Sequence, residues 1–455
     1  MSKPSNPQGT RDFSPQVMRK RNFLTNTIKG VFEKYGFEHL ETPALENLTT
    51  LTGKYGDEGD KLLYKIRSNK EISQEIESAK AIGIKTLLPD RWIPGKSKLG
   101  LRYDLTVPFA RFVVQHRNDV VFPFRRYQIQ PVWRADRPQR GRFREFVQCD
   151  ADSIGSKSLM QEADLIQIYN DTLSTIGLNN AVLRINHRKL LEAIVDEVGL
   201  SFNVGRFTTS LDKLDKIGKE GVAQEFQNLG ATEDSIAQIF DLIDQGSLTL
   251  DFVNSVETKF TSEKAKLACA ELRDVLSFLD ITEFKIKVEL DMSLARGLDY
   301  YTGCIFEVVV PGSGIGSISG GGRYDDLTSV FGLKDVSGVG ISFGIDRIYE
   351  ILEAQDLWPL YLDKSKGVLF CHFSNENQQY CNDVARILRA NGINCLVYPD
   401  RKKIGKQFEY ADKANYPIAV VVGDQEMKSN LLSVKDMKSG EQKKLTLSQL
   451  TEQLS

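Results

Sequence analysis

Residues 134–148 read Arg-Ala-Asp-Arg-Pro-Gln-Arg-Gly-Arg-Phe-Arg-Glu-Phe-Val-Gln, with five arginines within eleven residues, at positions 134, 137, 140, 142 and 144. Pro138 and Gly141 interrupt the stretch, which predicts a loop and not one helical stripe of arginines. Strand-like segments flank the loop at 127–133 and 143–149. The pattern predicts two antiparallel strands joined by a cationic loop.

The arginine-rich loop suits a phosphate. Guanidinium groups bind phosphate oxygens through paired N–H donors. Phosphoryl-group reactions need cations placed around phosphorus more than they need covalent help from the protein. At this point a solvated hairpin with surface ion pairs fits the arginine density equally well.

Composition excludes several classes of protein. The chain has 455 residues, enough for about three domains. With 41% hydrophobic and 26% charged residues it is neither collagen-like nor wholly disordered. Lys plus Arg is 59 and Asp plus Glu is 61, a net charge of −2. Because no overall basic surplus exists, contact with nucleic acid has to come from local patches.

The cysteines and the termini indicate a cytoplasmic protein. The six cysteines form no Cys-x-x-Cys pair and no zinc-finger spacing, so we expect reduced, mostly buried thiols. The N-terminus lacks an apolar signal core. The longest aliphatic stretches, such as 417–422, are far shorter than the ~20 residues that cross a bilayer. We expect no membrane association.

The chain pattern predicts three regions. Apolar spacing predicts helices at 16–35 and 159–173, strands within 99–155, and a mainly helical block from 187 to 280. Strand signals then return before a linker near 358–366. Beyond the linker, strands and helices alternate, as in a small α/β domain. Further segments with strand or helix patterns are 285–290, 304–310, 339–343 and 345–352, then 368–373, 376–390, 393–398, 404–414 and 418–422.

Two polar side chains precede an apolar helix. Asp104 and Thr106 stand two residues apart, so on a strand they would share one face, where a carboxylate and a hydroxyl suit an ammonium group. Alternatively, Thr106 caps the helix that follows, because Pro108 fits a first helical turn. Taken alone, the capping interpretation is favoured.

Three further segments suggest a ligand site. Residues 294–303 place Arg296 before a glycine and two adjacent tyrosines, which on a strand would face opposite sides. Residues 319–327 hold three glycines before Arg-Tyr, which suits close approach of a flat ligand or a tight hairpin. Arg347 stands at a helix start, where a cation opposes the helix dipole, and this favours a ligand-facing role.

Together these segments resemble the class II aminoacyl-tRNA synthetases, and specifically the histidyl-tRNA synthetase family, over essentially the whole chain. Residues 294–303 and 320–327 are similar to the two motifs particular to the histidine enzymes. The other matching segments are 9–13 (N-terminal signature), 37–43 (motif 1), 124–152 (motif 2) and 339–347 (motif 3).

The resemblance implies an architecture and a reaction. It implies an α+β catalytic domain with an antiparallel sheet at 1–186 and 281–357, a helical insertion at 187–280, and an anticodon-binding α/β domain at 366–455. It also implies a cytoplasmic homodimer that binds L-histidine, ATP with Mg²⁺ and tRNA(His), with no protein-ligated metal. Histidine would be activated to its adenylate, with release of pyrophosphate, and then transferred to the 3′ end of the tRNA.

The resemblance also implies residue roles. Arg134 and Arg296 would be catalytic, beside the α-phosphate, with Arg134 also among the ATP-binding residues. Some family members carry glutamate where this chain has the shorter Asp104 and Asp152. The remaining roles implied are ATP binding by Arg142 and Arg347, ammonium binding by Asp104, Thr106 and Gln148, and imidazole binding by Asp152 and Tyr301 with Tyr300 beside them.

Two other functions are compatible with parts of this pattern. A synthetase-like regulatory subunit of histidine biosynthesis would bind histidine without charging tRNA, but such paralogues lack the C-terminal domain and lose motif arginines that this chain keeps. A tRNA- or histidine-sensing pseudo-enzyme would bind without catalysis. Histidine-dependent exchange of pyrophosphate into ATP separates an enzyme from both.

Overall fold

The chain was analysed as a computed structural model, which describes residues 3–53, 56–69, 72–73, 97–139, 141–200, 202, 204–295, 301–325, 327–360, 362 and 367–454. The chain divides into two compact units, Met1–Leu357 and Trp358–Ser455. The helical segment predicted at 187–280 belongs to the first unit, so its limits as a separate domain stay a prediction.

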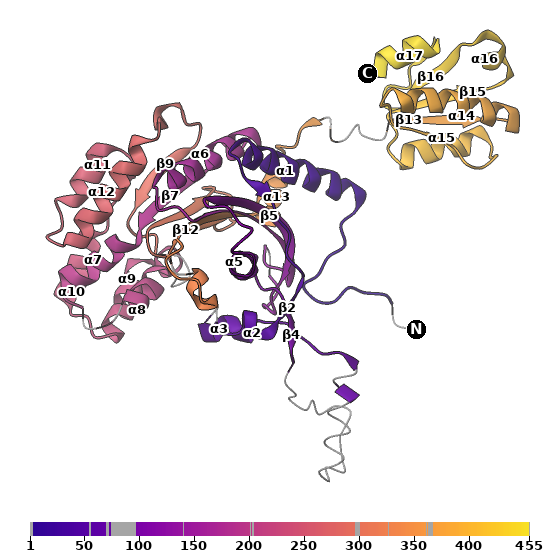
Figure 1. The fold of residues 1–455 in the computed structure, drawn as a ribbon. Coiled ribbons are helices and arrows are strands. Elements are labelled where there is room, and N and C mark those ends of the chain that lie inside the picture. Colours follow the sequence, from indigo (N-terminus) through magenta and orange to yellow (C-terminus); the bar gives the residue numbers. More distant parts are fainter. Residues whose placement is uncertain are drawn as a thin grey trace. The chain divides into compact units, whose positions relative to one another are not determined.

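A nine-stranded sheet forms the centre of the first unit (Figure 1). The pairs β1–β5 and β7–β9 are parallel and the other pairs are antiparallel, which confirms the predicted α+β class with a mainly antiparallel sheet. The strand order is β1 (Glu38–His39), β5 (Phe124–Trp133), β6 (Glu145–Ile154), β12 (Gly338–Gly344), β11 (Ser319–Tyr324), β10 (Cys304–Val309), β7 (Val182–His187), β9 (Lys287–Asp291) and β8 (Gln245–Ser247).

The arginine-rich loop joins β5 and β6, as the sequence predicts. These two strands pair without a break from Phe124–Ile154 to Trp133–Glu145. The loop between the strands contains Pro138 and Gly141, and Gly141 has a φ of 70°, which favours glycine. A long, regular hairpin therefore carries the loop.

Three helices cover one face of the sheet: α1 (Pro15–Lys34), α6 (Met160–Thr175) and α13 (Ile345–Ala354) (Figure 1). Phe343 of β12 points into this layer, with its ring 6.0 Å from Phe32 of α1 and 5.3 Å from Tyr169 of α6. Because side chains alternate along a strand, Ser342 and Gly344 face the opposite side of the sheet. That opposite side carries the candidate site.

The segment from 187 to 280 is mainly helical, as predicted. One element was missed, the short strand β8, which pairs with β9 at the sheet edge. Its three residues contain a glycine and carry no apolar alternation, so a period-two pattern could not reveal it. The helices are α7 (Arg188–Val198), α8 (Val204–Leu211), α9 (Leu214–Asn228), α10 (Glu233–Leu242), α11 (Leu250–Glu257) and α12 (Glu263–Ser277).

Smaller elements complete the first unit. The helix α5 (Thr106–Gln115) lies on the side of the sheet away from α1 (Figure 1). A three-stranded sheet in the order β2 (Leu45–Asn47), β4 (Leu99–Leu101) and β3 (Lys65–Ile66) precedes α5. The remaining short elements are α2 (Leu48–Leu51), α3 (Gly56–Lys61), η1 (Ile281–Glu283) and η2 (Leu327–Phe331).

The second unit has the predicted alternation of strands and helices. Its sheet order is β14 (Cys395–Val397), β13 (Val368–His372), β15 (Ile418–Val422), β16 (Leu432–Asp436) and β17 (Gln442–Leu445), and the last two strands were not predicted. Val368, Phe370 and Val420 lie in its buried core. The helices are α14 (Asn375–Ala390), α15 (Ile404–Lys413), α16 (Asp424–Ser429) and α17 (Leu447–Leu454).

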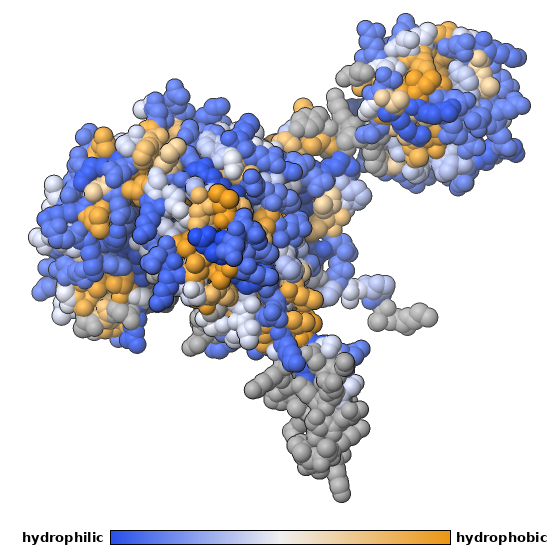
Figure 2. All heavy atoms as spheres, viewed as in Figure 1, coloured by the Kyte–Doolittle hydropathy of each residue, from blue (hydrophilic) through white to orange (hydrophobic). Residues whose placement is uncertain are grey.

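Hydrophilic residues cover most of the face seen in Figure 2, and hydrophobic residues appear there in separate patches. No helix within the described parts of the chain is both long and apolar enough to cross a bilayer. Five of the six cysteines are buried and all six are free thiols, as expected from the sequence.

Candidate active site

A cavity of about 290 Å³ opens beside β6, β11 and β12. Arg134, Arg142 and Arg347 all line it, although the first two flank the hairpin loop and the third lies more than two hundred positions later in the chain. Gly320 and Gly344 line it as well. Three guanidinium groups around one cavity suit a ligand with several phosphate groups.

Arg134 is held in place by aromatic rings and one carbonyl group. Its Nε donates to the backbone oxygen of Tyr103 at 3.1 Å, and its guanidinium lies 4.2 Å from the Tyr103 ring centroid and 5.1 Å from that of Phe146. Stacking of this kind fixes the plane of the guanidinium of Arg134, which also lines the cavity.

Arg142 and Arg347 are placed differently. Arg142 exposes half of its side chain and has Asp136 at 3.8 Å. Arg347 is the third residue of α13, and its guanidinium donates to the backbone oxygen of Ser317. Arg347 therefore lies on the cavity wall at the helix start that the sequence indicates.

The N-terminal segment supports this wall. Gly9 accepts a backbone hydrogen bond from Arg144 in the loop. Arg11 stacks over Phe143 at 3.2 Å and pairs with Asp346 of α13 at 2.7 Å, and Arg21 of α1 pairs with the same carboxylate at 2.5 Å. Asp346 was not predicted, because its role depends on two cations that are distant in sequence.

The face of β6 next to the cavity carries three polar side chains, Gln148, Asp150 and Asp152. They alternate along the strand, so they point to one side of the sheet. Asp152 is held from two sides: its Oδ1 accepts from the hydroxyl of Tyr324 at 2.6 Å, and its Oδ2 lies 2.7 Å from Arg126. Burial raises the pKa of Asp152, while Arg126 and Tyr324 act to lower it.

Two glycines make room for this group of side chains. A Cβ atom on Gly340 would lie 2.0 Å from Oδ1 of Asp152, and one on Gly322 would lie 2.8 Å from the ring of Tyr301. Both approaches are far below van der Waals contact. The glycine-rich stretch, predicted as a place where a ligand comes close to the backbone, forms strand β11. There Gly322 has no side chain, which leaves space for the ring of Tyr301.

The strand interpretation of Asp104 and Thr106 is wrong. Strand β4 ends at Leu101, and Thr106 is the first residue of α5. Asp104 caps the helix, because its Oδ1 accepts from the backbone N–H of Val107 at 3.1 Å. The predicted cap by Thr106 is wrong as well, because Thr106 is already helical and Leu105 occupies the N-cap position without a side-chain hydrogen bond. The carboxylate of Asp104, one residue earlier, binds the free N–H of Val107 instead.

The segment 294–303 is described only in part, and Arg296 and Tyr300 lie outside the described residues. Tyr301 precedes β10, which begins at Cys304. The expectation that both tyrosines lie on a strand is therefore wrong for Tyr301.

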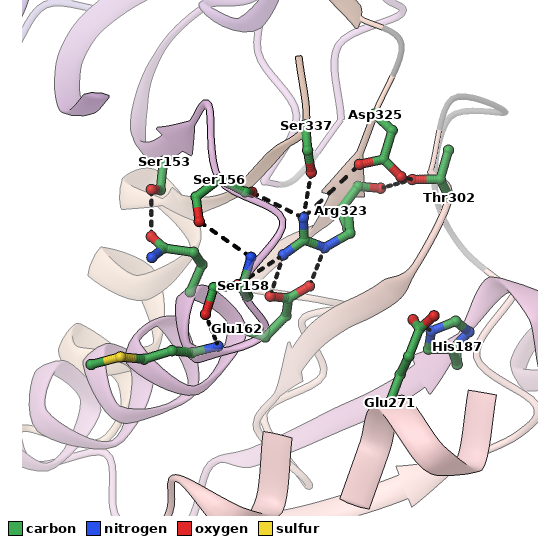
Figure 3. A network of polar contacts seen from close by, with 12 residues as sticks. Ser153, Ser156, Ser158, Glu162, His187, Glu271, Thr302, Arg323, Asp325 and Ser337 are labelled. Carbon is green, nitrogen blue, oxygen red and sulfur yellow. Dashed lines mark hydrogen bonds and ion pairs between the residues drawn. The ribbon is translucent and has the colours of Figure 1, made fainter. Parts of the chain in front are cut away.

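A polar network behind β11 fixes the chain directly after Tyr301 (Figure 3). Arg323 exposes 5% of its surface and binds both oxygens of Glu162, at 2.5 Å each. Thr302 donates its hydroxyl to Asp325 at 2.6 Å, and its N–H donates to the backbone oxygen of Arg323. His187 and Glu271 lie 2.8 Å apart in the same view.

The sequence interpretation missed Asp150, Arg126 and Tyr324 at this face. For Asp150 a signal was present, because polar residues at 148, 150 and 152 alternate in a strand-rich region. Tyr324 follows the glycine run, and Arg126 has no comparable signal in the sequence. Within the described residues no group of three or more His, Cys, Asp or Glu side chains is placed to hold a metal ion.

Comparisons with known proteins agree with this geometry. Residues 90–348 match the family described as "Histidyl-tRNA synthetase", and residues 360–455 match "Anticodon binding domain". The chain is 47% identical to a histidine–tRNA ligase of Flavobacterium johnsoniae, over 97% of both chains, and 46% identical to that of Cytophaga hutchinsonii, over 100% of both. The solved histidyl-tRNA synthetase of Nostoc sp. PCC 7120 superposes with a TM-score of 0.83, at 29% identity, over 100% of this chain and 99% of that one. The chain belongs to the histidyl-tRNA synthetase family.

Proposed function

We propose that this protein is a histidine–tRNA ligase. It activates L-histidine with ATP to histidyl-adenylate and pyrophosphate, and then transfers the histidyl group to the 3′ end of tRNA(His). The observation that carries the proposal is the convergence of Arg134, Arg142 and Arg347 on one cavity beside the polar face of β6. Family membership supports the same reaction.

In the first step the carboxylate oxygen of histidine attacks the α-phosphorus of ATP. A new O–P bond forms, the bond between the α-phosphorus and the bridging oxygen breaks, and pyrophosphate leaves. Arg134 and Arg296 offset the negative charge that builds up on the α-phosphate oxygens. The attacking carboxylate is already ionised at neutral pH, so the step needs no general base.

The other site residues bind and orient the substrates. Arg347 and Arg142 bind the outer phosphates of ATP. On the histidine side, Asp104, Thr106 and Gln148 bind the α-ammonium group, and Asp152 and Tyr301 bind the imidazole with Tyr300 beside them. Discrimination against other amino acids is steep, because a wrong side chain leaves buried polar partners unpaired.

Mg²⁺ enters with ATP. The carboxylates on the cavity wall are Asp136 and Asp346, and two arginines already engage Asp346. Such a donor set fits a cation held mainly by substrate phosphates and water, since Mg²⁺ needs only one or two protein carboxylates. When bound, it would neutralise charge on the leaving pyrophosphate.

The test of this function is pyrophosphate exchange into ATP with each of the twenty amino acids. We expect exchange with histidine and none above background with the others. Histidine binding without exchange would indicate a sensor or a regulatory subunit instead. Exchange with a different amino acid would contradict the histidine assignment alone.

The second unit, Trp358–Ser455, binds the anticodon region of tRNA(His) in this proposal. Its match to the anticodon-binding family and its separate core support that role. Deleting residues 366–455 should leave histidine-dependent exchange within about threefold of the full chain but lower tRNA charging by at least about tenfold. Normal charging by the truncated protein, measured at limiting tRNA, would contradict the assignment.

We also propose that the protein acts as a cytoplasmic homodimer. The short strand β1 forms one edge of the nine-stranded sheet, where no other strand of the described residues pairs with it, and it lies in the segment 37–43 that resembles motif 1. The buried free thiols suit a reducing compartment. Light scattering of the full chain tests the dimer directly.

A further inference from the structure

Asp150 lies in the middle of the polar face of β6 and has no part in the roles proposed above. It exposes 2% of its surface. Its register neighbours are Gln128 on β5 and Ser342 on β12, and Ser342 lines the arginine cavity. Gln148, two positions earlier on the same face, lines that cavity as well.

Around Asp150, the buried hydrogen-bond acceptors outnumber the donors available to them. Within the described chain, Oε1 of Gln128 and Oε1 of Gln148 have no hydrogen-bond partner. The carboxylate of Asp150 has only the hydroxyl of Ser342 beside it as a donor. The amide nitrogen of Gln128 is already committed, since it donates to Thr42 at 2.9 Å and to Gln130 at 2.6 Å. One hydroxyl cannot satisfy four buried acceptor oxygens, and those left without a donor are costly unless a ligand supplies one.

The charges facing Asp150 also favour a cation. Among the described residues that act on the charge of Asp150, Asp104 and Asp152 are carboxylates and Arg126 of β5 is a cation. Tyr169 of α6 and Cys149 are further titratable neighbours. Burial raises the pKa of Asp150 to about 7, Asp152 and Asp104 raise it further, and Arg126 and the Ser342 hydroxyl partly offset this. With all three carboxylates ionised, a single guanidinium leaves this group negative.

We propose that Asp150 is a further specificity-determining residue, which accepts a hydrogen bond from the α-ammonium group of the bound histidine. The ammonium group has three N–H donors and one positive charge, so it can satisfy Asp150 and Gln148 together. This inference rests on the proposed function, because it assigns a contact within that site.

Other ligand groups fit these atoms less well. An anion is repelled by the carboxylates, and the imidazole has Asp152, which Tyr324 and Arg126 already orient. If Asp150 served structure alone, it would carry a proton and donate it to Gln128 across the strand pair. An asparagine could replace it in that role, because its amide also donates.

The experiment compares two ligands that differ only in the ammonium group. L-histidine and 3-(imidazol-4-yl)propanoate are titrated into the full chain, its Asp150→Asn variant and a control, Asp164→Asn, which removes a different partly buried carboxylate that pairs with Arg125. We expect Asp150→Asn to weaken histidine binding about 10- to 100-fold, the usual effect of losing a hydrogen bond to a charged group. Affinity for the propanoate should change less than about twofold.

Each outcome decides a separate question. Equal weakening of both ligands would place Asp150 at the imidazole and overturn the inference, and unchanged binding of both would show a structural role and overturn it too. Failure of the unaltered protein to bind histidine would instead overturn the proposed function. If Asp150→Asn fails to fold, Asp150→Ser repeats the comparison with a smaller neutral side chain, and the Asp164→Asn control should match the unaltered protein throughout.

Discussion

The site has two ends that are built in different ways: the arginine-lined cavity (the cavity end) and the buried polar face of β6 around Asp152 (the strand end). Beside the arginine-lined cavity, Arg142 leaves half of its side chain exposed, and the carboxylate of Asp136 lies 3.8 Å away. At the strand end, Arg126 is fully buried, lies 2.7 Å from Asp152 and stacks over Phe109 at 4.3 Å. Water screens the charges of the first end, whereas burial makes those of the second end costly. Substitutions should therefore affect mainly catalysis at the cavity end, and both stability and recognition at the strand end.

The strongest test of this contrast is Arg126→Met. Removing the cation leaves the buried carboxylate of Asp152 unpaired, so we expect the free energy of unfolding at pH 8 to fall by about 3–5 kcal/mol. The loss should shrink at pH 5, where Asp152 can take up a proton because burial already raises its pKa. Urea unfolding of the full chain, followed by a probe in the first unit, measures both values. Adding Asp152→Asn should restore most of the stability, and failure to do so would assign the loss to packing against Phe109.

Arg134→Met is the matched change at the cavity end. We expect histidine-dependent pyrophosphate exchange to fall by about 10²–10³-fold, the usual effect of removing one preorganised charge donor from a developing anion. Stability should change by less than about 1 kcal/mol, since Arg134 is only partly buried and its Nε contact is a single carbonyl group. Arg134→Lys keeps the charge but not the planar fork, so it should recover activity only in part. Unaltered exchange in the methionine variant would remove Arg134 from the reaction.

Replacing Asp150 should have a smaller effect on stability than Arg126→Met, and in the opposite direction. Its pKa in the folded protein is about 7, above that of an unfolded aspartate, so the folded state binds the extra proton between about pH 4 and pH 7. Stability therefore falls as pH rises through this range, and the cost is complete above pH 7. Asp150→Asn removes that cost, and we expect the variant to be more stable than the parent at pH 8 by about 1–3 kcal/mol, and equal to it at pH 4. Thermal unfolding at the two pH values checks this. A variant that is less stable than the parent at pH 8 would show that the ionised carboxylate of Asp150 does not destabilise the folded protein.

The contrast also explains what could be predicted from the sequence. The arginines of 134–142 stand out because they cluster along the chain and lie beside Pro138 and Gly141, which identify the loop. The strands that carry this loop, β5 and β6, are long and strongly patterned, so their pairing was predicted correctly.

The buried end depends on contacts between distant segments. Arg126, Asp152 and Tyr324 come from three strands, and their spacing in sequence does not reveal that they meet. The error at Asp104 has a local cause: residues two apart look alike on a strand and in a helix start, and only the hydrogen bond to Val107 decides between them. Strand β8 was missed because three residues are too few for a period to appear.

The mildest test returns to the exposed loop, where two arginines differ in placement. Arg142 lines the cavity, whereas Arg137 in the same loop is exposed and is not among the lining residues. We expect Arg142→Gln to raise the KM for ATP about three- to tenfold at low salt, with little change in kcat, because an exposed charge contributes mainly to binding and is screened. The effect should shrink at high ionic strength, since the Debye length falls to about 3 Å at 1 M salt. Arg137→Gln should leave the KM unchanged at both ionic strengths. Equal effects from the two variants would mean that the loop acts through its total charge, and the placement of Arg142 on the cavity wall would then carry no specific role.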